Sequence, residues 1–132
     1  MSKDLTEKIN TLKEEHLPKV GRWEIAQNSE PFSTQCVGKM EAFDLTLIVH
    51  QESFFILNTY VSPPDEAQSG IRTFIEAVEE HRVLPEVLLV MDTKLFAELK
   101  PIAEIFDFSI IHTDKLKAVP RVLRDMARML KR

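Results

Sequence analysis

The chain has only three glycines and one cysteine among its 132 residues. The glycines stand at positions 21, 38 and 70, so neither the G-x-G-x-x-G dinucleotide loop nor a P-loop can be written. A lone Cys36 excludes an intrachain disulfide and a C-x-x-C zinc site, and it agrees with a reducing cytoplasm. No activating signature surrounds Cys36, so we expect a structural thiol.

The chain also lacks the sequence motifs of several other classes of protein. The absence of G-x-S-x-G excludes a serine nucleophile elbow, and the absence of H-E-x-x-H excludes the helical zinc motif of metalloproteases. No apolar run has the length of a membrane span. The charged N-terminus, with Lys3 and Asp4, lacks the apolar core of a signal peptide. We therefore expect a cytoplasmic protein, and no motif implies a cofactor.

Charge is distributed unevenly along the chain. The formal net charge of −4 argues against a general nucleic-acid binder. Residues 65–107 hold ten acids and four bases, a net charge of −6, whereas residues 115–132 hold seven bases and one acid, a net charge of +6. Blocks of opposite sign attract within one molecule or between molecules, and in the second case we expect a protein partner or a homo-oligomer.

Hydrophobic periodicity predicts one α/β domain over residues 1–132. Its mixed sheet contains an antiparallel hairpin followed by α-β-α-β-α, with parallel later strands and with helices packing on the sheet. The predicted helices cover 3–17, which packs on or beside the domain, then 65–82, and the stretches around 95–106 and 116–130. The predicted strands cover 22–27, 45–50, 54–61, 87–91 and 110–111.

Local sequence features refine this prediction. The hairpin strands are apolar on both faces, which indicates a central place in a covered sheet, with Phe54 and Phe55 in the core. The run 62–65, Ser-Pro-Pro-Asp, is a helix-start pattern. Gly70 indicates close packing of the second helix against the sheet. Pro101 predicts a kink or a break in the third helix, because proline removes a backbone donor.

The later part of the chain combines the apolar hairpin, a strand led by Pro85-Glu86-Val87, and a helix that begins Asp92-Thr93-Lys94-Leu95. Leu99 and Pro101 continue that helix. On these features, residues 45–130 resemble an uncharacterised bacterial family of the domain-of-unknown-function type. The resemblance implies no established activity.

The element order is similar to the ribonuclease-H-like fold of integrases and transposases. In that fold an acid follows the fourth strand, and Asp92 matches it. The same chemistry needs an acid on the first strand, to help hold two metal ions around a phosphate. The stretch 34–40, which we take as the counterpart, has no Asp or Glu. The resemblance therefore implies a shared fold without an active nuclease site.

Three candidate catalytic residues, Asp92, His112 and Asp114, lie at the ends of two predicted parallel strands. Ligands of open α/β sheets bind at such ends, and two carboxylates with an imidazole suit a divalent cation or acid–base chemistry. Asp92 and Asp114 are thus candidate metal ligands. The alternative is that both cap the helices that follow them, since Asp is a preferred N-cap residue. His50 is a further candidate for the same crevice.

Basic residues recur along one side of the last predicted helix, and we call Lys117, Arg121, Arg124 and Arg128 the basic stripe. Lys131 continues its spacing. Such a stripe binds an acidic partner, phosphate groups or an anionic membrane surface, or it is a solvated helix face. No aromatic residue interleaves it, which argues against nucleic acid. The sequence thus predicts a non-catalytic binding or protein-interaction module, with a metal-dependent hydrolase or nuclease-like enzyme as the alternative.

Overall fold

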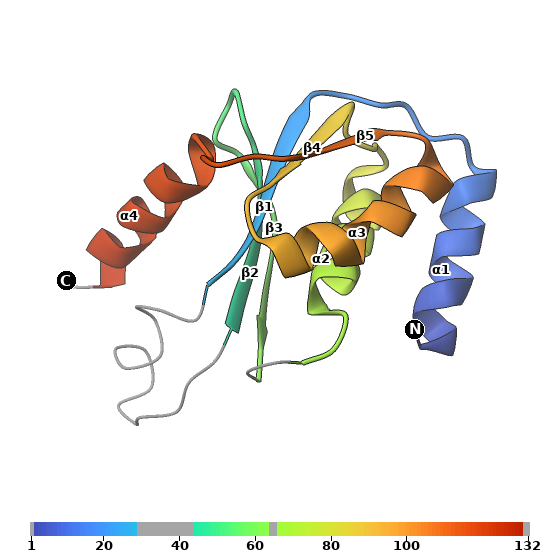
Figure 1. Cartoon of the computed structure of the whole chain (residues 1–132), viewed down its shortest axis with the longest axis horizontal. Helices are drawn as coiled ribbons and strands as arrows, with labels where there is room; N and C mark the ends of the chain where they lie inside the picture. Colours follow the sequence, from blue (N-terminus) through green and yellow to red (C-terminus); the bar gives the residue numbers. More distant parts are fainter. Residues whose placement is uncertain (1, 29–43, 64–65, 131–132) are drawn as a thin grey trace.

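The structure, a computed structural model, describes residues 2–28, 44–63 and 66–130. A five-stranded sheet stands between α4 on one side and α1, α2 and α3 on the other (Figure 1). The elements are α1 (Lys3–Glu14), β1 (Arg22–Asn28), β2 (Asp44–His50), β3 (Ile56–Ser62), α2 (Ser69–His81), β4 (Val87–Val90), α3 (Thr93–Phe106), β5 (Ser109–His112) and α4 (Ala118–Leu130).

The strands lie in the order β3-β2-β1-β4-β5. The pairs β1–β2 and β2–β3 are antiparallel, whereas β1–β4 and β4–β5 are parallel. This is the predicted mixed α/β fold, with its hairpin and its later parallel strands. Because β1, β4 and β5 run in the same direction, their carboxyl ends meet at one edge of the sheet.

Two apolar cores hold the layers together. The larger core lies under α1, α2 and α3 and includes Trp23, whose ring centroid is 5.9 Å from that of Phe74. The smaller core joins the sheet to α4 through Leu47, Val49 and other apolar residues. Every interior position of β2 is buried, because alternate side chains enter the two cores. The expectation that this strand is covered on both faces is confirmed.

The prediction for the second hairpin strand was wrong in two respects. β3 is an edge strand, and it begins at Ile56. Phe54 and Phe55 therefore lie in the connection and are 37% and 56% exposed, not in the core. The reason is local, since Phe54 has a left-handed φ of 61° and its N–H donates to the carbonyl oxygen of His50, which closes a turn.

Helix boundaries also differ from the prediction. α1 ends at Glu14, near the left-handed His16. α2 begins at Ser69 after the left-handed Gln68, so the helix-start pattern at 62–65 does not begin it. Ser62 ends β3, and residues 64–65 lie outside the described chain.

Two packing predictions were also corrected. A Cβ placed on Gly70 would meet Leu95 and Glu98 of α3, so this glycine allows α2 to approach α3 and not the sheet. α3 runs unbroken from Thr93 to Phe106 through Pro101. Burial of Leu99, Ile102 and other residues on its inner face holds α3 together despite the missing backbone donor.

Candidate functional site

Among the described residues, Glu24 on the central strand β1 carries a carboxylate that is unusual because it is fully buried. The residue is 0% exposed and its side chain points toward α4. Its two oxygens accept hydrogen bonds from the backbone N–H groups of Lys117, Ala118 and Val119 at 2.9–3.0 Å. The side-chain amide of Gln51 donates a further bond at 2.9 Å.

This arrangement follows from elementary helix physics. The first N–H groups of a helix have no intrahelical acceptor, and the helix dipole makes this end partly positive. A buried carboxylate accepts hydrogen bonds from these N–H groups and places a negative charge at the partly positive helix end, just as a bound anion does. Glu24 is therefore the cap of α4, supplied by a strand 93 residues earlier in the chain. We did not expect this role for Glu24, although a glutamate between Trp23 and Ile25 in an apolar strand is a usable signal.

Asp92 is the N-cap of α3. Its Oδ1 accepts the N–H of Leu95 at 2.8 Å, which confirms the capping alternative for this residue. The exposed carboxylate also borders a crevice of about 300 Å³ where β1 and β4 end against α4. The crevice is lined by Ile25, Ala26, Gln27, Met91, Asp92, Leu116, Val119, Pro120 and Leu123. Among the described residues of this mostly apolar lining, Asp92 is the single carboxylate.

The other two candidates do not line this crevice. The Nε2–H of His112 donates to the carbonyl oxygen of Met91 at 2.9 Å, and its ring lies 5.2 Å from that of Phe96. Asp114 is exposed and does not cap α4, because α4 begins at Ala118 and its first N–H groups bond to Glu24. Within residues 2–28, 44–63 and 66–130, no group of three or more His, Cys, Asp or Glu is arranged to hold a metal ion.

His50 lies away from the crevice. It pairs with Trp23, at the opposite end of β1 from the crevice, and its Nδ1 is 2.9 Å from the hydroxyl of Ser53. Cys36, and the stretch 34–40 taken as the counterpart of an integrase first strand, lie outside the described residues. The first strand that the structure describes is β1, which does carry an acid.

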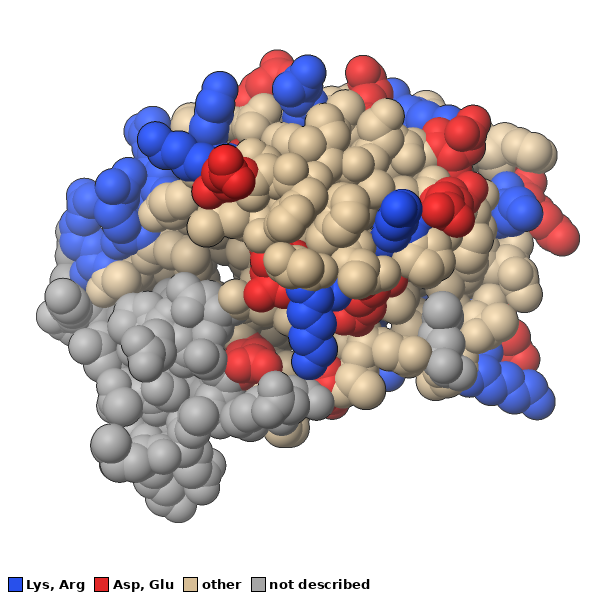
Figure 2. Space-filling view, in the orientation of Figure 1, with Lys and Arg blue, Asp and Glu red and all other residues tan. Residues whose placement is uncertain are grey.

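Arg121, Arg124 and Arg128 of the basic stripe lie on the exposed side of α4, whereas Lys117, predicted on the same helix, is exposed just before it begins (Figure 2). Lys and Arg side chains gather over this helix, at the left of the view. The guanidinium of Arg121 lies 4.6 Å from the ring centroid of Phe54, and Arg128 is 3.6 Å from Asp125. Lys117 and Arg124 form no ion pair with any described residue. Lys131 lies outside the described part.

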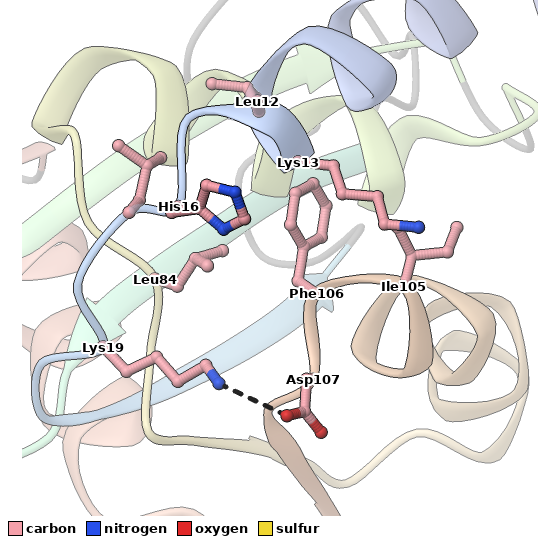
Figure 3. A pocket seen from close by; sticks show the side chains of 9 residues that line it. Leu12, Lys13, His16, Lys19, Leu84, Ile105, Phe106 and Asp107 are labelled. Carbon is pink, nitrogen blue, oxygen red and sulfur yellow. Dashed lines mark ion pairs between the residues drawn. The ribbon is translucent and has the colours of Figure 1, made fainter.

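A second pocket, of about 310 Å³, lies between the ends of α1 and α3 (Figure 3). The side chains of Lys13, His16 and Lys19 surround an apolar floor, and Lys19 pairs with Asp107 at 3.8 Å. Both helices present their carbonyl ends here, and cations stabilise such ends. The positive charges of Lys13 and Lys19 therefore have a structural explanation, because they lie near the carbonyl ends of these helices.

Comparison with known proteins places this sequence in a family. The profile of a family described as a domain of unknown function, DUF6930, matches residues 8–127. The chain belongs to the DUF6930 family. No curated protein matches its sequence. In the described part of this DUF6930 chain, no helix is long and apolar enough to cross a membrane.

Solved structures with a similar fold include the catalytic core domain of HTLV-2 integrase in complex with magnesium. Its trimeric form has a TM-score of 0.65 at 13% identity, covering 85% of this chain and 69% of that one. The dimeric form has a TM-score of 0.64 at 12% identity, covering 85% and 70%. At this identity the similarity concerns the fold, which agrees with the ribonuclease-H-like order of elements.

Proposed function

We propose that this DUF6930 domain is a non-catalytic protein-interaction module that binds an acidic partner through the basic stripe of α4. The observation that carries the proposal is the exposed row of three arginines on one face of α4, which Lys117 extends just before the helix begins. Only Arg128 has a carboxylate within ion-pair distance among the described residues. Charges of one sign on a protruding face steer and select a partner of opposite sign.

The alternative is a metal-dependent hydrolase or nuclease, and the fold similarity to an integrase bound to magnesium supports it. The residues of this chain do not fit that metal. Glu24, the acid of β1, has both oxygens bonded to the start of α4, and Asp92 caps α3. If Glu24 bound a metal ion, the backbone N–H groups of Lys117, Ala118 and Val119 would lose their acceptor. We therefore derive no hydrolytic step.

The test is binding of a fluorescein-labelled peptide rich in Asp and Glu, followed by fluorescence anisotropy at low and at physiological salt. We expect the wild-type domain to bind and the affinity to fall with salt, since exposed charges are screened. The triple variant Arg121→Glu, Arg124→Glu and Arg128→Glu should lose binding. A wild-type domain that does not bind the peptide at low salt contradicts the proposal.

A matched control separates the stripe from the net charge. Lys3, Lys94 and Lys100 are exposed on α1 and α3, and reversing all three to Glu changes the net charge by the same amount. We expect this control to retain most of the affinity. Equal loss in both triple variants would mean that overall charge, and not the stripe, governs binding. A duplex DNA probe, if bound more tightly than the peptide, would point to nucleic acid instead.

A further inference from the structure

We infer that the turn between β2 and β3 is the apolar half of the same docking surface. Phe54 and Phe55 of this turn, with Ile56 at the start of β3, are called the hairpin tip, and its Phe54 would hold an apolar side chain of the acidic partner. The inference rests on the proposed function and deepens it, because it specifies the partner as an acidic segment that also carries aromatic or aliphatic residues. A partner with acidic residues alone would make no apolar contact with the hairpin tip.

The first observation is exposure. Phe54, Phe55 and Ile56 are 37%, 56% and 38% exposed, whereas many other large apolar side chains of this domain are buried in its cores. Phe54 lies against Arg121 of α4, whereas Phe55 lies on the other side of the sheet, so Phe54 is the exposed apolar residue that borders the basic stripe. The ring of Phe55 makes an edge contact with the ring of His81, the last residue of α2, at 5.8 Å.

The second observation is that the tip is held rigidly in a strained shape. Phe54 has a φ of 61°, a left-handed conformation that is unfavourable for a bulky residue. Backbone bonds from Phe54 N–H to His50 O at 2.9 Å and from His50 N–H to Phe55 O at 2.8 Å fix it. Strain of this kind persists where the surroundings enforce it, and a rigid apolar anchor loses little entropy on binding.

The third observation is the position of the tip beside the basic stripe. The Arg121 guanidinium lies 4.6 Å from the Phe54 ring centroid, so the tip and the stripe are continuous. The green turn and the start of α4 also lie near each other in Figure 1. Aromatic residues and arginine are the side chains that dominate binding energy in protein interfaces. The cations of α4 make the complementary partner acidic.

The test compares two labelled peptides with the same number of acidic residues. One also carries Trp and Leu, and in the other these are replaced by Ser. We expect the wild-type domain to bind the peptide with Trp and Leu at least about tenfold more tightly, the size of a single interface anchor. Phe54→Ser should reduce this affinity to that of the purely acidic peptide, and should leave the affinity for the purely acidic peptide unchanged.

Ile105→Ser is the control, because Ile105 is also an exposed apolar residue but lies on α3. It should change neither affinity. Equal wild-type affinities for the two peptides would overturn the role of the tip while leaving the proposed function intact. Binding of neither peptide would overturn both. Vesicles of phosphatidylcholine and phosphatidylserine are a last arm. If they bind in a Phe54-dependent way and the peptides do not, the surface is for membranes and the inference is wrong.

Discussion

At the scale of single residues, acidic and hydroxyl side chains of this chain satisfy the starts of its helices. Ser2 accepts the N–H of Leu5 at 3.2 Å at α1, and Asp92 performs the same task at α3. Glu98 lies beside the start of α2, where the backbone N–H of Ile71 favours its charged form. Ser2 and Asp92 therefore serve as structural caps.

Glu98 gives a pH prediction. Burial raises the pKa of its carboxyl group above the ordinary value, and the nearby N–H of Ile71 and the Lys94 ammonium only partly oppose this. The folded state therefore holds the proton more tightly than the unfolded chain, so this group stabilises the fold below a pH of about 4.3 and the contribution is lost as pH rises through the raised pKa. Glu98→Gln should gain stability relative to wild type as the pH increases.

Urea unfolding of both proteins between about pH 4 and pH 7 measures this difference, since the unperturbed glutamate pKa lies at the lower end of that range. Glu104→Gln, on the exposed side of α3, is the control and should show a flat difference. A Glu98→Gln variant whose relative stability falls as the pH rises would show that its charged form stabilises the fold.

At the scale of elements, α4 is joined to the sheet by a small core and by one carboxylate. Leu47, Val49, Val119 and neighbouring residues provide the apolar contact, and Glu24 accepts the bonds of the first helical turn. The basic stripe is on this helix, so the orientation of the proposed binding surface depends on Glu24.

Replacing Glu24 with Gln should destabilise the domain by about 2–4 kcal/mol. The amide has one acceptor oxygen, and its NH₂ group would face the N–H groups of Ala118 and Val119. Chemical unfolding followed by the fluorescence of Trp23, the one tryptophan, measures the loss. Glu104→Gln again serves as the control. A loss no larger than that of the control would mean that the capping bonds contribute nothing.

At the scale of the whole molecule, the features that could be predicted from the sequence are those that depend on local patterns. Periodicity is a local property, so the α/β class, the parallel later strands and the burial of β2 followed from the sequence. The cap of α4 joins residues 93 to 95 positions apart, and no local pattern encodes such a pair. The aromatic run at the hairpin was misassigned because hydrophobicity does not reveal a left-handed residue such as Phe54.

The same distinction applies to the candidate site. A strand followed by an acid indicated a helix cap at Asp92 correctly, because capping is a local interaction. For Asp114 the prediction was wrong, since a distant carboxylate occupies the start of α4. Pro101 was expected to interrupt α3, but burial of the inner face of that helix outweighs one missing bond.

The most direct test of the central claim, that Glu24 is a helix cap and not a metal ligand, is calorimetric titration of the wild-type domain with Mg²⁺ and Mn²⁺. We predict no saturable binding, and no difference between the wild-type domain and Asp92→Asn. Saturable binding of either ion that is abolished by both Asp92→Asn and Glu24→Gln, with the fold of each variant intact by circular dichroism, would contradict the account.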